Sequence, residues 1–165
     1  KKAYVVDTNR YFDDNHWSSL DIDFLYKDTA SLNSKSIDFI YCFDVLEHIS
    51  NPEAFFSEMK RIISNTGYLF ASWDMRDHLK LNNEEEWFDM HKYSNLVWNL
   101  QMSNRSSFVN RLQHSEWINL FEKYGFEVIN SEVMYSDIAS DAFLEKYSIR
   151  LESAYRAEVV LKIKS

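Results

Sequence analysis

The sequence contains very little cysteine, proline or glycine. Among its 165 residues there are one cysteine, one proline and two glycines. The lone Cys42 excludes an internal disulfide and a metal site built from several thiolates. A single cysteine also favours a reducing, cytoplasmic location.

Long apolar runs and an excess of positive charge are missing as well. No apolar stretch approaches the roughly 20 residues that a membrane-spanning helix requires. The opening "KKAYVVDTN" has too short an apolar part for a signal peptide. The formal net charge of −8 and the pI near 5.1 argue against a surface that tracks nucleic-acid phosphates. We therefore expect no membrane span and no nucleic-acid partner.

The residues that are abundant indicate an ordinary globular protein. Hydrophobic residues make up 45% of the chain, charged residues 27% and aromatic residues 16%. This composition and length predict one domain, residues 1–165, with a bulky aromatic core.

Apolar runs in the first half predict buried strands. Residues 3–7 and 22–28 are short apolar stretches that each end in an acid, and residues 36–43 are almost continuously apolar. Such runs are typical of parallel strands covered on both faces. A helix follows, with Asn51 as N-cap and Pro52 in its first position. Gly67 is expected to end this helix before a fourth strand at residues 68–73.

The second half resumes the alternation after an irregular segment. Residues 76–113 are interpreted as a helical, aromatic insertion, in which His78, His91, Arg105 and Arg111 are expected at the surface. Ser115 is a predicted N-cap, and Gly125 a predicted stop, of the next helix. Strands at 126–135 and 158–163 flank a helix that opens at Ser140. Strands alternating with helices predict an α/β, doubly wound, mostly parallel sheet.

The central stretch "SIDFIYCFDVLEHISNPEAFFSEMKRIISNTGYLF" is the most specific part of the sequence. It resembles class I S-adenosylmethionine-dependent methyltransferases of the type 11-like branch. In that branch a strand D-x-[IV]-x-x-x-x-V-L-E-H precedes a helix that starts with N-P-E or D-P-E. The later "EWINLFEKYGFEVI" is similar to the family's final helix and sixth strand. The resemblance implies a Rossmann-like fold that binds S-adenosylmethionine.

The resemblance assigns roles to residues at the ends of the predicted strands. Asp7 would accept hydrogen bonds from the ribose hydroxyls of the cofactor, because a carboxylate can receive two donors. Asp28 and Thr29 would lie near the adenine. Phe43 and Asp44 would pass along the methionine part. Each acid could equally be a turn residue or a helix cap.

Glu47 and His48 follow the same strand and leave two interpretations open. They can cap and orient the following helix, or His48 can act as a general base, because a neutral imidazole can take a proton from a hydroxyl acceptor. Two candidate ligands without a third do not define a metal site, so no metal is predicted.

The chain departs from the family at its beginning. The family's first strand and its G-x-G-x-G turn are not recognisable, because no glycine precedes Gly67. In the family topology that strand lies in the middle of the sheet, so a gap with unpaired edges is expected. A longer parent protein, a rearranged sheet or a shortened relative without activity would each account for this departure. An exposed strand edge would also favour a homodimer.

Three functions compete on this evidence. The first is methyl transfer from S-adenosylmethionine to a small-molecule acceptor, which the aromatic insertion suggests could be sugar-linked. The second is a catalytically inactive methyltransferase-like scaffold, which the absent glycine loop favours. The third, a nicotinamide-binding oxidoreductase, also places an acid after its second strand but does not explain the V-L-E-H stretch.

Overall fold

Strands and helices alternate along the chain, as the sequence predicts. The computed structural model describes residues 2–5, 23–26, 29–102, 108–136 and 152–164. The strands and longer helices are β1 (Lys2–Val5), β2 (Asp23–Tyr26), β3 (Ile37–Phe43), α2 (Pro52–Ile62), β4 (Ile63–Asp74), α3 (Asn95–Met102), α4 (His114–Lys123), β5 (Phe126–Tyr135) and β6 (Ala154–Ile163). The short 3-10 turns are η2 (Thr29–Ser31), η3 (Leu46–His48), η4 (Glu84–Glu86) and η5 (Asp89–Lys92). The helix predicted to open at Ser140 lies outside the described residues.

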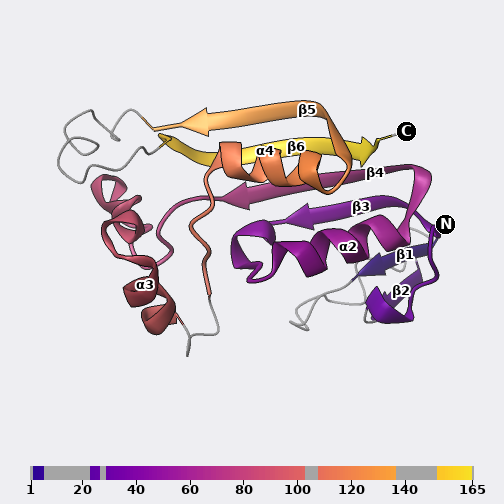
Figure 1. Cartoon of the computed structure of the whole chain (residues 1–165), viewed down its shortest axis with the longest axis horizontal. Coiled ribbons are helices and arrows are strands. Elements are labelled where there is room, and N and C mark those ends of the chain that lie inside the picture. Colours follow the sequence, from indigo (N-terminus) through magenta and orange to yellow (C-terminus); the bar gives the residue numbers. More distant parts are fainter. Residues whose placement is uncertain (1, 6–22, 27–28, 103–107, 137–151, 165) are drawn as a thin grey trace.

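The main sheet has the strand order β3-β4-β6-β5. Strands β3 and β4 are parallel, whereas β6 is antiparallel to both β4 and β5. Three of the four strands therefore point the same way, as their arrows show in Figure 1. The predicted α/β class with a mostly parallel, Rossmann-like sheet is confirmed.

The first two strands form a sheet of their own. Strands β1 and β2 are parallel, with Val5 opposite Tyr26 at their carboxyl ends. Within the described residues, β3 has a hydrogen-bonded neighbour only on its β4 side. The gap expected where the family's first strand would lie remains a prediction.

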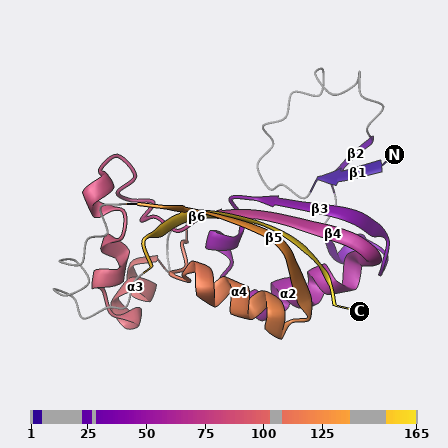
Figure 2. The same ribbon diagram turned by 90° about the horizontal axis from the view of Figure 1, so that it is seen from above.

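One face of the main sheet is covered by helices. Figure 2 shows α2 and α4 side by side against the same face. The alternation of β4 directs Leu69, Ala71 and Trp73 into this layer, where none of them is exposed. Phe56 of α2 and Phe121 of α4 meet them, with ring centroids 5.4 Å apart. This aromatic layer is the main core.

The opposite face of the sheet is open in the described part of the chain. The same alternation directs Phe39, Tyr41 and Tyr68 to this face, where their exposed fractions are 59%, 59% and 45%. The ring of Tyr41 stacks on that of Phe70 at 4.9 Å. Helices on this second face, which a doubly wound fold requires, remain a prediction.

The predicted start of α2 is confirmed and its predicted end is wrong. Asn51 Oδ1 accepts the Ala54 N–H at 3.1 Å, and Pro52 is the first helical residue. The helix ends at Ile62, and Gly67 lies inside β4 instead. A Cβ at Gly67 would lie 3.0 Å from two carbonyl oxygens of β3, so glycine is needed for close strand contact, not for a helix cap.

Helix α4 begins earlier than predicted. Its N-cap is Gln113, not Ser115, because the Glu116 carboxylate accepts the Gln113 N–H at 2.9 Å. Its predicted end is confirmed by Gly125, whose φ of +84° suits glycine.

The segment between β4 and α4 contains a small second core. Met90, Trp98, Met102 and Val109 are buried together, and Phe108 packs against them. The proposed bounds of the insertion, 76–113, remain a prediction. Among the described residues, no helix combines the length and apolar character needed to cross a membrane.

Candidate functional site

The candidate site lies where β3 and β4 reach their carboxyl ends. In open α/β sheets, ligands bind in the crevice beyond these ends. Figure 1 shows that α3 and its neighbouring turns lie beyond the β4 arrowhead, at this edge of the sheet. The insertion is therefore next to the residues that follow β3 and β4.

Strand β3 ends in a sharp turn at Asp44. The Asp44 N–H still donates to the Ser72 carbonyl of β4 at 2.9 Å, but its own φ is +51°. Aspartate is one of the few residues other than glycine that enters this left-handed region readily. The turn leads the chain out of the sheet into η3 and leaves Phe43 half exposed.

An arginine from the far end of the chain contacts both predicted residues at this turn. Arg156 Nη2 donates to Asp44 Oδ1 and to Ser72 Oγ, each at 2.9 Å. Its guanidinium carbon lies 4.8 Å from the centre of the Phe43 ring. Sequence analysis did not find Arg156, because it reaches the site only through the pairing of β6 with β4.

Glu47 is a buried acid just behind this turn. It is 2% exposed, its Oε1 accepts the Asp74 N–H at 3.3 Å, and its Oε2 has no hydrogen-bond partner. Burial raises the pKa of the Glu47 carboxyl to about 8; two backbone hydrogen bonds oppose this rise, while Asp44 and Asp74 add to it. At neutral pH the side chain is mainly protonated.

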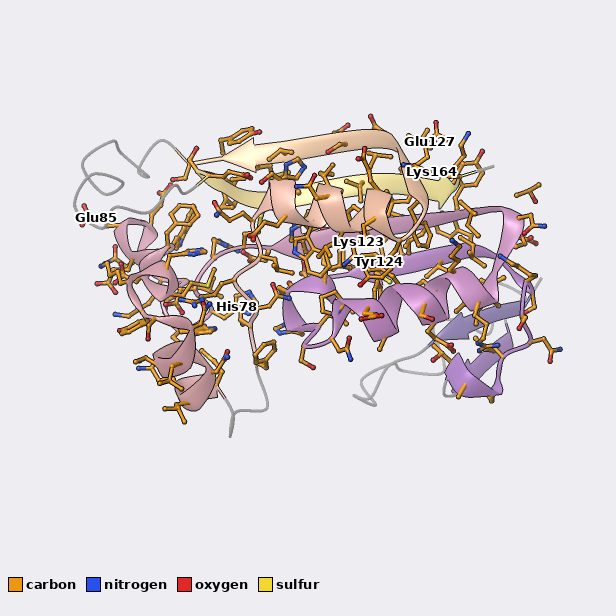
Figure 3. The ribbon with its side chains drawn as sticks, viewed as in Figure 1. His78, Glu85, Lys123, Tyr124, Glu127 and Lys164 are labelled. Carbon is orange, nitrogen blue, oxygen red and sulfur yellow. The ribbon has the colours of Figure 1, made fainter. Side chains whose placement is uncertain are left out.

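His48 and His78 meet at the same edge, as an edge-to-face pair with ring centroids 5.2 Å apart. His78 (Figure 3) follows β4, and its Nε2 is buried 4.0 Å from Asp74 Oδ2 without a hydrogen bond. Burial lowers the pKa of His78; His48 adds to the effect and Asp74 opposes it. Within the described part of the chain, no three His, Cys, Asp or Glu side chains are grouped to hold a metal ion.

Asp74 and Arg76 close the β4 end of the site. Arg76 Nε donates to both carboxylate oxygens of Asp74, at 2.9 and 3.0 Å. The Arg76 guanidinium carbon lies 4.8 Å from the Trp87 ring centre and 5.7 Å from that of Tyr155. The ion pair is thus held in a fixed orientation by two aromatic rings.

Not all of the other polar residues of the insertion lie at the surface, where the sequence analysis expected them. His91 is largely buried, and burial lowers its pKa to about 4. Arg111 Nη1 donates to the Met90 carbonyl at 3.0 Å, and so ties the insertion together. Arg105 lies outside the described residues.

A groove of about 370 Å³ lies between the insertion, the end of η3 and the start of α4. Its lining combines apolar, aromatic, amide, hydroxyl and charged residues: Ile49, Ser50, Pro52, Asn95, Trp98, Asn99, Phe108, Asn110, Arg111, Leu112 and Glu116. The groove is adjacent to His48, because Ile49 follows that residue and Phe108 contacts it through its carbonyl.

The structure brings together only some of the predicted site residues. Phe43, Asp44 and His48 lie at the carboxyl edge, whereas Asp7 and Asp28 lie outside the described residues. The Thr29 carbonyl accepts from Arg61 Nη2 at 2.9 Å, in the last turn of α2. Helix α2 starts near the carboxyl edge and spans roughly 16 Å, so Thr29 is at the other end of this layer. A cofactor site with Thr29 near the adenine and Asp44 along the methionine part remains a prediction.

Several of the solved structures with similar folds are described as methyltransferases. A Bacillus halodurans C-125 protein proposed to be a methyltransferase has a TM-score of 0.58 and 14% identity, over 98% of this chain and 81% of its own. A chain from the Haloferax volcanii complex between the Trm112 methyltransferase activator and a proposed methyltransferase has a TM-score of 0.58 and 15% identity, with 98% and 72% covered. A SAM-dependent methyltransferase of Methanosarcina mazei has a TM-score of 0.52 and 15% identity, with 87% and 68% covered.

Identities this low establish the fold alone. Among curated proteins, no sequence matches the chain significantly. The family described as "methyltransferase domain" matches residues 2–131, which is most of the chain and includes β3, the turn at Asp44 and α2. The chain belongs to this family of methyltransferase domains.

Proposed function

We propose that the protein transfers the methyl group of S-adenosylmethionine to a small-molecule or sugar-containing acceptor. The observation that carries the proposal is the charge arrangement at the Asp44 turn of a methyltransferase-family sheet. Asp44 and Arg156 present one carboxylate and one guanidinium side by side. Such a pair complements the amino-acid part of the cofactor, which carries an ammonium and a carboxylate.

The remaining cofactor contacts follow the family resemblance. Asp7 would accept the ribose hydroxyls, Asp28 would contact the adenine, and Phe43 would pack along the methionine part. When bound, the cofactor supplies an electrophilic methyl group. The protein's residues hold the acceptor in line with it, and such positioning can provide most of the rate enhancement.

The groove beside His48 is the proposed acceptor site. Its amide and charged side chains, such as Asn99 and Glu116, offer hydrogen bonds to a polar molecule, and Phe108 offers an apolar surface. The groove reaches the carboxyl edge through the turn that carries His48. A small acceptor held there would be next to the Asp44 turn.

Calorimetric titration with S-adenosylmethionine tests the proposal directly. We expect the unchanged protein to bind, and Asp44→Asn and Asp7→Ala each to weaken binding at least tenfold, about 1.4 kcal/mol. Glu127→Gln is the matched control, because Glu127 is an exposed acid that pairs with Lys162 in β6 (Figure 3 labels Glu127). The control variant should bind as the unchanged protein does.

Absence of binding by the unchanged protein would contradict the proposal and favour an inactive scaffold. Equal affinity in Asp44→Asn would show that the turn does not hold the cofactor. Thermal unfolding of each variant separates lost binding from lost folding.

A further inference from the structure

The turn that carries His48 is held by a segment 60 residues further along the chain. The Asn110 N–H donates to the Glu47 carbonyl at 2.7 Å. Asn110 Nδ2 donates to the carbonyls of Leu46 and Ile49, at 2.7 and 3.1 Å. One asparagine therefore satisfies three carbonyl groups of a single short turn, and so fixes the backbone on both sides of His48.

The same segment fixes the protonation pattern of the His48 ring. His48 Nδ1 lies 2.6 Å from the Phe108 carbonyl oxygen. A carbonyl oxygen can only accept, so Nδ1 must carry the hydrogen of this bond. In the neutral ring the lone pair is then on Nε2. Because the residue is exposed, we expect this nitrogen to be within reach of a ligand.

The neighbouring His78 is less suited to the same task. Its Nε2 is buried next to Asp74 and has no hydrogen-bond partner. A buried nitrogen cannot reach a hydroxyl group in the groove without movement. The two imidazoles are thus in contact but differ in access.

We infer that His48 Nε2 is the general base for a hydroxyl acceptor in the groove, and that Asn110 is a positioning residue that holds it there. This inference rests on the proposed function and specifies its substrate class. The acceptor oxygen bonds to the methyl carbon while the carbon–sulfur bond of a sulfonium donor breaks and leaves its electron pair on sulfur. The hydroxyl proton moves to His48 Nε2, which gives an imidazolium and a neutral thioether.

The arrangement explains why the insertion is tied to the turn after β3. Phe108 lines the groove and its carbonyl contacts His48, so the acceptor site and the base are joined through one residue. A hydroxyl benefits from this base because it is not ionised at neutral pH. A thiol acceptor would depend on it much less.

Histidine side-chain NMR tests the positioning without any ligand. Long-range proton–nitrogen spectra of the unchanged protein at mildly alkaline pH should show His48 with its hydrogen on Nδ1. Asn110→Asp replaces the amide donor with a carboxylate, which cannot donate to the Leu46 and Ile49 carbonyls, and should shift His48 toward a mixture of tautomers. Asn110→Gln, which restores the donor, should recover part of the Nδ1 form. Asn99→Ala, in the groove wall, should leave the spectrum unchanged.

A predominant Nε2–H form of His48 in the unchanged protein would overturn the inference. Diethylpyrocarbonate, mapped by mass spectrometry, gives an independent measure, because it modifies accessible unprotonated nitrogens. His48 should react at least tenfold faster than His78, and the reverse order would also overturn it.

The substrate class is tested with methyl-¹³C-labelled S-adenosylmethionine and a metabolite extract of the source cells. We expect the label as an O-methyl group, and a roughly 100-fold slower transfer in His48→Gln. An N-, S- or C-methyl product, or no product, would overturn the hydroxyl assignment. Calorimetry of His48→Gln should show unchanged cofactor affinity. If cofactor binding fails while the tautomer is as expected, the proposed function has failed and not the positioning.

Discussion

The two ends of the main sheet differ in how completely their polar groups are satisfied. At the amino end, Arg61 donates to the carbonyls of Thr29 and Leu32, at 2.9 and 2.8 Å, and forms an ion pair with Glu58 at 2.7 Å. At the carboxyl end, Glu47 Oε2 and His78 Nε2 are buried without hydrogen bonds. A left-handed residue occurs at each end, Lys35 at the amino end and Asp44 at the carboxyl end.

The difference indicates which end is scaffold and which is site. Buried polar atoms without partners cost free energy, so they persist where they serve another purpose. At the amino end, in contrast, the polar groups of Arg61 and Glu58 are paired, although the backbone of Lys35 is also left-handed, with a φ of +57°. Substitution of a buried, unpaired group at the carboxyl end should therefore stabilise the protein at some pH values, whereas substitution of a paired group should only weaken it.

The largest expected effect is at Glu47. Its folded-state pKa of about 8 is above the ordinary 4.5, so the folded state binds more protons between these values and stability falls as pH rises through them. The fall should reach a few kcal/mol, because each pKa unit corresponds to about 1.4 kcal/mol. Glu47→Gln should remove this slope, as urea unfolding from pH 5 to pH 9 would reveal. An unchanged slope would mean that Glu47 is not the buried acid responsible.

A smaller loss is expected at the amino end from Gly67→Ala. The new methyl group would lie 2.7 Å from Ile63 Cγ1 and 3.0 Å from two β3 carbonyl oxygens. Overpacking of this kind costs about 2 kcal/mol. Chemical denaturation measures the loss, and Ser57→Ala on the exposed side of α2 is the control. A neutral Gly67→Ala would show that β3 and β4 can separate there without cost.

The smallest effect is expected at Asn51, a satisfied group at the carboxyl end. Asn51→Ala removes the cap on the Ala54 N–H and should cost about 1 kcal/mol in the free energy of unfolding. Asn51→Asp, which keeps an accepting oxygen, should retain most of the stability. If Asn51→Ala is neutral, the first turn of α2 is held by tertiary packing and not by its cap.

Local signals in the sequence were sufficient for much of the fold. The Asn-Pro pair marked the first turn of α2, because a capping side chain and a fixed φ act within four residues. The apolar alternation of β5 gave its bounds, Phe126–Tyr135, as observed. The turn at Phe43 and Asp44 was placed at the end of its strand for the same reason.

Other parts of the site depend on contacts that no local pattern records. Arg156 reaches Asp44 from a position 112 residues away, and Asn110 reaches Leu46 from 64 residues away. Gly67 was misread because glycine after a helix is a common stop, while its actual role depends on the neighbouring strand. His78 was expected at the surface. Its burial depends on how the insertion folds back, which no local sequence pattern records.

The position of Cys42 makes this residue a reporter of the local opening of β3. This single cysteine of the chain lies on β3 and points into the core, and burial raises the pKa of its thiol to about 12. A thiol reagent would react with it only after β3 opens, since the reactive thiolate is scarce in the closed state. The rate of alkylation would therefore measure how often β3, the strand that leads to Asp44, opens locally. No engineered label would be needed.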